Sequence, residues 1–176
     1  MMVRLTIVIA TYNRAEQLMI TLRSVAAQTA DKAIWECVVV DNNSKDHTRG
    51  NIEQFIADNP SLNIRYCMET KQGLSHARNA GISNAQGDII AFIDDDEHIV
   101  PEFVDSYIDL FDSVPQAMSA GGKIIAEYPS GRPKWMSKYA EEPIANPMDF
   151  GETIKPFPKG RIPGGGNMAT RTTDFE

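Results

Sequence analysis

The chain of 176 residues has only two cysteines, no long hydrophobic run and no block of basic residues. Cys37 and Cys67 each lie in an apolar stretch, which favours small core side chains over a redox or metal pair and suits a reducing cytosol. No run approaches the roughly 20 apolar residues that span a bilayer, and residues 5–10 lead into polar residues without a signal-peptide cleavage site. We therefore expect a soluble, cytoplasmic protein whose first strand lies near the N-terminus.

Positive charge is also scarce, because 17 Lys and Arg stand against 24 Asp and Glu, for a net charge of −7. The electrostatic footprint of a nucleic-acid backbone binder is missing, so we expect no DNA or RNA polymer as a partner. Without a polybasic run, the sequence gives little support to direct adsorption on a membrane. Hydrophobic residues make up 42% of the chain, which excludes a wholly disordered protein and fits one domain with a real core.

Apolar, β-branched runs alternate with segments of helical spacing along much of the chain. Such alternation predicts βαβ crossovers, and therefore an open, mainly parallel sheet with helices on both faces. The expected strands are 5–10, 35–40, 62–67, 88–93 and 117–128, and the expected helices are the segment after Asn13, a segment around 52–57, 74–85 and 102–111.

Residues 129–166 differ in composition, because they hold seven of the ten prolines and six of the twelve glycines. Regular helix or sheet cannot continue for long in such a segment. A connection of this length in a compact domain is usually functional or mobile, so we expect it to become ordered when a ligand binds.

Polar side chains directly follow three of the expected strands. Residues 11–14 read Thr-Tyr-Asn-Arg, 41–44 read Asp-Asn-Asn-Ser and 94–97 read Asp-Asp-Asp-Glu. Because ligands of open α/β sheets bind beyond the carboxyl ends of the strands, these segments predict one shared site. Taken alone, Asp41 with the three residues after it is more typical of a turn and helix cap than of a binding site. Tyr12 is either a half-buried aromatic or a ring that stacks on a planar base.

The four consecutive acids that end with Glu97 are the strongest signal, because they repel one another unless a cation or a ligand compensates them. Residues 94–112 hold eight acids and no Lys or Arg. The i, i+2 spacing of an Asp-x-Asp pair at a strand end places Asp94 and Asp96 on one side, where they can hold Mg²⁺ or Mn²⁺ against a diphosphate. The alternative is a solvated acidic turn in which Glu97 or Glu102 caps the following helix.

Four motifs stand in register along the chain. Together they resemble the family 2 glycosyltransferases of the GT-A fold, over residues 3–128 and, more loosely, over 164–169 with Arg171. The resemblance implies an enzyme of polysaccharide biosynthesis. Such an enzyme transfers a sugar, with inversion, from a UDP- or dTDP-sugar donor to a hydroxyl of a glycan or lipid-linked acceptor. The motifs are Thr11-Tyr12-Asn13-Arg14, Val38-Val39-Val40-Asp41-Asn42-Asn43-Ser44, Gly73-Leu74-Ser75-His76-Ala77-Arg78-Asn79 and Phe92-Ile93-Asp94-Asp95-Asp96-Glu97.

The resemblance also implies roles for single residues. Asp41 accepts a hydrogen bond from the base, and Arg78 lies near the base or the diphosphate, although from the residues alone Arg78 or Lys71 could equally belong to a plain surface helix. The implied nucleotide-sugar-binding residues are Thr11, Tyr12, Asn13, Arg14, Asp41, Arg78, Asp94 and Asp95. The implied ligands of Mg²⁺ or Mn²⁺ are Asp94 and Asp96, and the acceptor-side residues are Gly165 and Asn167. Trp135 is a further acceptor-side candidate, because its ring could stack on a sugar; the alternative is a plain packing anchor.

The resemblance divides the single domain into a nucleotide-binding half, 1–128, and an acceptor-side segment, 129–176. The family's general base follows the acceptor segment, so we expect it beyond Glu176, in an apparently truncated chain. The alternative is an inactive nucleotide-sugar-binding fragment that self-associates through uncovered apolar surface.

The chain departs from the family's pattern at two positions. Ala10 stands where the family has Pro, and Glu97 stands where the family has Asp, and neither change removes an implied ligand. Contact with the inner face of a membrane would come through a lipid-linked acceptor.

Two other enzyme classes fit less well. A haloacid-dehalogenase-like phosphatase carries its Asp-x-Asp pair on the first strand and has Thr or Val where this chain has His98. A sugar nucleotidyltransferase needs a glycine-rich phosphate loop after the first strand, and residues 10–15 contain no glycine.

Overall fold

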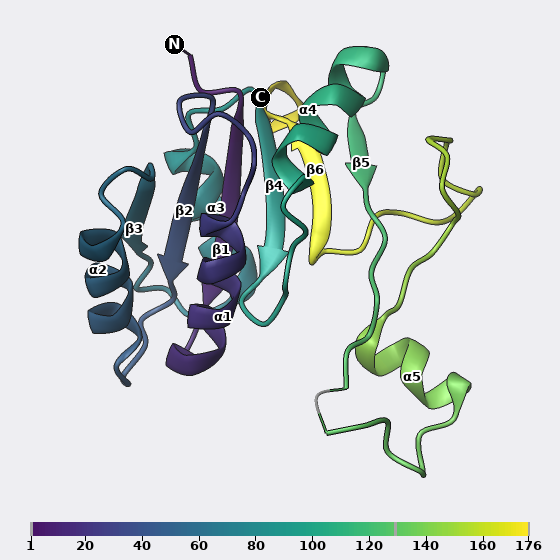
Figure 1. Ribbon diagram of the computed structural model, residues 1–176, viewed down its shortest axis with the longest axis horizontal. Helices are drawn as coiled ribbons and strands as arrows, with labels where there is room; N and C mark the ends of the chain where they lie inside the picture. The colour runs from purple at the N-terminus through teal and green to yellow at the C-terminus, as the bar shows by residue number, and fades with distance from the viewer. Residues whose placement is uncertain (1, 129, 176) are drawn as a thin grey trace.

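The computed structural model describes residues 2–128 and 130–175 as a six-stranded sheet in the order β3-β2-β1-β4-β6-β5, with helices on both faces (Figure 1). The strands are β1 (Leu5–Thr11), β2 (Trp35–Asp41), β3 (Ile64–Met68), β4 (Ile89–Asp94), β5 (Ser119–Gly121) and β6 (Asn167–Arg171). The helices are α1 (Ala15–Ala26), α2 (Thr48–Asp58), α3 (Leu74–Asn84), α4 (Phe103–Ser113) and α5 (Lys138–Ala145), with a 3-10 turn at Thr172–Phe175.

The first four strands are parallel, which confirms the open, mainly parallel sheet. The sheet then changes direction, because β6 pairs antiparallel with β4, and β5 pairs antiparallel with β6. The sequence did not predict β6. Its five residues follow the proline- and glycine-rich segment and carry no long apolar run of their own.

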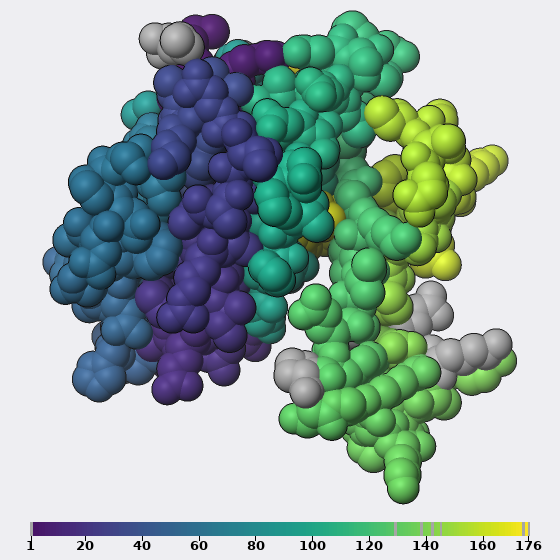
Figure 2. Space-filling model, in the orientation of Figure 1, coloured from purple at the N-terminus to yellow at the C-terminus, as the bar shows by residue number. Residues whose placement is uncertain are grey.

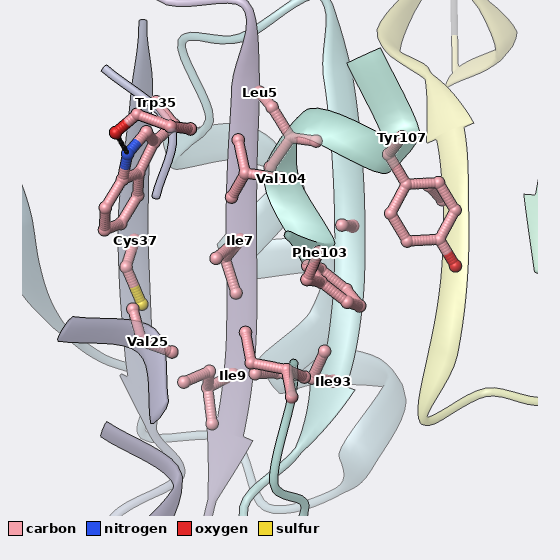
Figure 3. Packing of buried hydrophobic residues seen from close by; sticks show 14 of the residues in the cluster. Leu5, Ile7, Ile9, Val25, Trp35, Cys37, Ile93, Phe103, Val104 and Tyr107 are labelled. Carbon is pink, nitrogen blue, oxygen red and sulfur yellow. Dashed lines mark hydrogen bonds between the residues drawn. The ribbon is translucent and has the colours of Figure 1, made fainter. Parts of the chain in front are cut away.

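The central strand β1 separates two apolar cores. Leu5, Ile7 and Ile9 are fully buried on the face covered by α1, α2 and α4, and Figure 3 shows Ile7 near Val104 of α4 and Ile9 near Val25 of α1. Val8 points to the opposite face, where it packs in a smaller cluster with Ala77 of α3. Each buried aliphatic side chain contributes roughly 1.5–3 kcal/mol, so the two cores fix the register that positions the strand ends.

The strand expected over 117–128 is much shorter in the structure. β5 has three residues, and Ile124 forms only an isolated antiparallel bridge with Met148. The chain leaves the sheet at two glycines, where a Cβ on Gly121 would lie 2.7 Å from Pro163 and a Cβ on Gly122 would lie 2.6 Å from the side chain of Asn167. Because the chain leaves the sheet here, β5 does not extend to residue 128 as the sequence predicted.

Residues 122–166, hereafter the long connection, join β5 to β6. The part that contains α5 projects from the α/β body in the direction in which β4 points, whereas residues 148–157 turn back and lie beside β5 and the C-terminal part of α4 (Figures 1 and 2). The only regular element within the described part of the connection is α5, which has eight residues and contains Pro143. This agrees with the expectation that no long regular element forms here.

Candidate active site

The carboxyl ends of β1, β2 and β4 meet at one edge of the sheet. Thr11 lies opposite Asp41 in the parallel ladder, and Ala10 lies opposite Asp94. The three polar segments of the sequence are therefore neighbours in space. Their side chains come from the last residue of each strand and from the turn that follows it.

Arg14, directly before α1, holds two of the acids. Its Nη1 donates to Oδ1 of Asp95 at 3.1 Å and to Oδ2 of Asp96 at 2.6 Å. Asp95 is only 7% exposed and also accepts a hydrogen bond from the Thr11 hydroxyl at 2.7 Å. Burial raises the pKa of Asp95, while the hydrogen bond from Thr11 opposes that shift. The side chain of Asp96 is 53% exposed, so a ligand can reach it from solvent.

Arg78, in α3, contacts the remaining aspartate. Its Nη2 lies 3.3 Å from Oδ1 of Asp94 and donates to the carbonyl oxygen of Gly165 at 3.0 Å. The guanidinium group also lies 5.6 Å from the ring centroid of Phe92, within cation–π range. A Cβ on Gly165 would lie 3.1 Å from two guanidinium nitrogens, so only glycine lets the loop pack this closely without moving Arg78.

The sequence predicted that Asp94 and Asp96 lie on the same side of a strand end, and the structure does not have this arrangement. β4 ends at Asp94, and the next two residues form a turn, so the alternation of a strand does not extend to Asp96. Arg14 pairs with Asp95 and Asp96, whereas Arg78 pairs with Asp94. The acidic run therefore does have positively charged partners. The local sequence did not show them, because both arginines come from distant parts of the chain.

The sequence had allowed Glu97 to cap the following helix, but Glu97 does not do so in the structure. Its Oε2 accepts a hydrogen bond from the backbone N–H of Asp94 at 3.2 Å, and Glu102, at the N-cap of α4, makes no side-chain capping bond. Burial raises the pKa of Glu97 to about 8, and the charges of Asp94 and Asp96 act in the same direction. A Cβ on Gly166 would collide with this carboxyl group. Glu97 therefore packs between the turn after β4 and residues 164–166, hereafter the glycine loop, where burial favours its uncharged form.

Asp41 is buried at the end of β2, with 1% of its surface exposed. Its Oδ1 accepts the backbone N–H of Ser44 at 2.8 Å, which is the turn role that the sequence allowed, and its Oδ2 accepts the hydroxyl of Tyr66 at 3.1 Å. Each carboxylate oxygen can accept two hydrogen bonds, so both keep acceptor capacity. Burial and the charge of Asp41 raise the pKa of Tyr66 to about 12, so its hydroxyl stays a donor. The sequence missed Tyr66, because only the pairing of β2 with β3 brings it here.

Tyr12 and Asn13 follow β1 at the mouth of the site. Asn13 has a left-handed backbone with φ of 53°; its N–H donates to Oγ of Ser44 at 2.9 Å, and its Oδ1 accepts the N–H of Lys45 at 2.7 Å. These bonds join the loops after β1 and β2. The Tyr12 side chain beside them is exposed, with 46% of its surface accessible.

The acceptor-side residues of the sequence are divided between two places. Gly165 lies against Arg78, and Asn167 is fixed at the start of β6 because its Oδ1 accepts the hydroxyl of Tyr107. Trp135 lies in the long connection and is 70% exposed. None of the hydrogen bonds, ion pairs or ring contacts of the described residues joins Trp135 to the strand ends.

A cavity of about 730 Å³ lies beside β5, within the size range of small-molecule sites. It forms between the C-terminal part of α4, β5 and residues 148–157, which are distant in sequence, so the sequence gave no sign of it. Its apolar lining includes Leu110, Val114, Met148, Phe150 and Phe157.

Two kinds of structural feature are absent from the described residues. Among residues 2–128 and 130–175, no three His, Cys, Asp or Glu side chains are arranged to hold a metal ion on their own. Within the same residues, no helix is long and apolar enough to cross a membrane.

A family model described as "Glycosyl transferase family 2" matches residues 6–176. The chain belongs to this family. A curated relative in Haloferax volcanii, "Glucosyl-dolichyl phosphate glucuronosyltransferase", is 27% identical over 134 residues, which cover 75% of this chain and 42% of the relative. The chain thus spans 42% of the length of this relative, and it spans 61% of the length of a second curated relative.

Solved structures of glycosyltransferases have the same fold. Staphylococcus aureus TarS 1-349 in complex with UDP superposes with a TM-score of 0.65 at 26% identity, over 77% of this chain and 39% of that chain. The mannosyltransferase PcManGT from Pyrobaculum calidifontis, solved with GDP-Man and Mn²⁺, has a TM-score of 0.70 at 21% identity, over 96% of this chain and 44% of that chain. The family and the GT-A fold implied by the four motifs are therefore confirmed.

Proposed function

We propose that this family 2 chain transfers a sugar, with inversion at the anomeric carbon, from a UDP- or dTDP-sugar to a hydroxyl of a glycan or lipid-linked acceptor. One observation carries the proposal: Arg14 and Arg78, from different parts of the chain, meet the three aspartates at the carboxyl edge of the sheet. Such an edge offers carboxylates for a cation and guanidinium groups for phosphate oxygens, which are the two needs of a leaving nucleoside diphosphate.

The nucleotide base is proposed to lie between Tyr12 and Asp41. The exposed Tyr12 ring can stack on a base, and the buried Asp41 carboxylate can accept the ring N–H that uracil and thymine present. The TarS structures with UDP and with UDP-GlcNAc support a uracil nucleotide.

Asp94 and Asp96 are the proposed ligands of Mg²⁺ or Mn²⁺. Carboxylate oxygens suit these hard cations, and Mg²⁺ is commonly held by one or two carboxylates together with substrate phosphates. That chemistry needs no cluster of three protein ligands, in keeping with the arrangement of the described residues. The bound cation would supply charge neutralisation of the diphosphate. Arg14 and Arg78 would then exchange their carboxylate partners for phosphate oxygens.

The acceptor is proposed to approach beside Gly165 and Asn167, with Trp135 stacking on a sugar ring when the long connection closes. These residues position the acceptor hydroxyl opposite the leaving diphosphate. The cavity beside β5 reaches Gly122, which packs against Asn167, and its apolar lining suits the apolar part of a lipid-linked acceptor. The name of the Haloferax relative, with its dolichyl phosphate, supports this acceptor class.

Calorimetric titration of UDP, dTDP and ADP, each with Mn²⁺ or with EDTA, tests the donor site. We expect UDP and dTDP to bind only with metal, and Asp96→Asn to weaken UDP binding at least about 10-fold. Asp109→Asn, at an exposed position of α4, is the matched control and should bind UDP as the wild type does.

Three outcomes distinguish the parts of the proposal. Equal UDP affinity in EDTA and in Mn²⁺ would refute the metal ligands, and tighter binding of ADP would refute the choice of base. Metal-dependent UDP binding without release of UDP from UDP-sugars, in the presence of glycan and lipid-linked acceptors, would favour the alternative of a nucleotide-sugar-binding chain without transferase activity.

A further inference from the structure

Asn42 follows β2 directly, yet its side chain does not stabilise the turn that begins there. That turn is held by Asp41, whose Oδ1 accepts the backbone N–H of Ser44. Asn42 is only 4% exposed, and within the described part of the chain all of its side-chain hydrogen bonds lead to residues 69–73, hereafter the β3–α3 loop. These partners lie 27 to 31 residues away in sequence, so the Asn42 side chain holds a distant segment.

The β3–α3 loop uses the whole hydrogen-bonding capacity of the Asn42 amide. Its Nδ2 donates to the carbonyl oxygen of Glu69 at 3.0 Å and to that of Lys71 at 2.8 Å. Its Oδ1 accepts the backbone N–H of Gly73 at 2.7 Å and Nε2 of Gln72 at 3.4 Å. A primary amide has two N–H donors and two acceptor sites, so none remains for a ligand. Asn42 can therefore influence a ligand only through the residues that it holds.

Backbone bonds tie the start of the same loop to the ends of β1 and β2. The N–H of Asn42 donates to the carbonyl oxygen of Thr11 at 2.9 Å, and the N–H of Glu69 donates to that of Asp41 at 3.0 Å. Residues 70–72 are exposed, so apolar packing does little to hold the loop. Its position beside Asp41 therefore depends on these bonds and on the Asn42 side chain.

The other end of the loop sets the start of α3. Gly73 is the N-cap of α3 and has φ of 134°, which residues other than glycine rarely adopt. Its N–H is the one that Asn42 accepts, so this bond fixes the residue from which the helix begins. Arg78 belongs to the same helix and contacts Asp94 and Gly165. Because a helix moves as a rigid element, a shift at Gly73 would displace the guanidinium group.

We propose that Asn42 is a positioning residue of the donor-nucleotide site. By holding the β3–α3 loop it sets two groups at once: the Asp41 carboxylate proposed to receive the base and the Arg78 guanidinium proposed to receive the diphosphate. A site that is ordered in advance loses less free energy to ordering when the nucleotide binds. The inference rests on the proposed nucleotide site, and it assigns Asn42 no contact with the nucleotide.

Calorimetric titration of UDP in saturating Mn²⁺ tests this role by comparing Asn42→Ala with Gln28→Ala. Gln28 is the matched control, because its side chain is also a buried amide with three hydrogen bonds to backbone groups, and it lies between α1 and α4. We expect UDP to bind about 10-fold more weakly to Asn42→Ala and with wild-type affinity to Gln28→Ala. Thermal unfolding should show similar losses of stability in the two variants. Asn42→Ser, a shorter side chain that keeps a polar group, is a second variant and should weaken UDP binding in the same direction.

Two further measurements separate positioning from a general loss of structure. Amide hydrogen exchange of Gly73 should be faster in Asn42→Ala and unchanged in Gln28→Ala. The effects of Asn42→Ala and Arg78→Gln on UDP affinity should not add, because Asn42 acts in part through Arg78. The loss caused by Arg78→Gln should therefore be smaller when Asn42 is already replaced.

The outcomes distinguish this inference from the proposed function. Wild-type UDP affinity in both Asn42 variants, or equal losses in Asn42→Ala and Gln28→Ala, would overturn the positioning role and leave the nucleotide site in place. Additive effects of Asn42→Ala and Arg78→Gln would also overturn it. A wild-type protein that does not bind UDP with Mn²⁺ would refute the proposed function, and the positioning role would be refuted with it.

Discussion

Arg14 lies 2.6 Å from Asp96, so a guanidinium group occupies one of the two carboxylates proposed to ligate a divalent cation. The same nitrogen contacts Asp95 at 3.1 Å. Arg14 thereby compensates the acidic run when no cation is bound, and it must leave Asp96 when a cation binds there. The arginine is at once a competitor of the metal and a candidate donor to the diphosphate.

Arg14→Gln should therefore have opposite effects on two ligands. Mn²⁺ alone should bind more tightly, by up to about 5-fold, because an exposed ion pair no longer competes. UDP in saturating Mn²⁺ should bind more weakly, because a phosphate donor is lost. Mn²⁺ paramagnetic resonance and calorimetry measure the two affinities. Arg23→Gln, at an exposed position of α1, should change neither, and weaker binding of Mn²⁺ alone by Arg14→Gln would count against the exchange.

Arg78 should control the order of the glycine loop, because its Nη2 holds the carbonyl of Gly165. In Arg78→Gln, amide hydrogen exchange over 164–167 should become faster. In the wild type, UDP with Mn²⁺ should slow exchange in the long connection, and this protection should be lost in the variant. Arg49→Gln breaks an exposed pair with Glu53 on α2 and serves as the control. Identical exchange in all three proteins would refute the role of Arg78.

Tyr66→Phe should reveal the bond to Asp41 through the pH dependence of stability. The phenol has a usual pKa of 10.0 and a folded-state pKa of about 12, so between these values the unfolded chain loses its proton first. The wild type therefore loses stability as pH rises through this window, and the variant lacks this contribution. We expect the wild type to be about 1 kcal/mol more stable near neutral pH. Urea unfolding should show this difference shrinking above pH 10, and a constant difference would contradict the assignment.

Gly81→Ala should destabilise the contact between α3 and β1. A Cβ at Gly81 would collide with Val8, whose β-branched side chain has little freedom in the packed sheet, so the cost should be about 1–3 kcal/mol. Gly50→Ala is the counterpart, because its Cβ would meet nothing within 4 Å and it lies inside α2. That change should stabilise by about 0.5–1 kcal/mol. Thermal unfolding of both variants checks the pair, and a neutral Gly81→Ala would show that α3 can shift.

The parallel half of the fold was predictable from the sequence alone. β1, β2 and β4 are covered on both faces, so they need continuous apolar runs, and these runs predicted them with errors of one residue. Because parallel strands end at the same edge, the polar segments after them also predicted a shared site. The four motifs placed the chain in its family before any contact was known.

Which side chains meet at that edge depends on how distant parts of the chain fold together. Arg14 is 82 residues from Asp96, and Arg78 is 87 residues from Gly165. The local spacing of apolar and polar residues indicates which face of its own helix or strand a residue occupies. It does not indicate which residues of distant elements lie close together. The antiparallel β6 and the raised pKa of Glu97 have the same origin, since pairing partners and burial are properties of the assembled sheet. Which side chains of the long connection are exposed was also not predictable from the sequence, because exposure depends on how the chain packs.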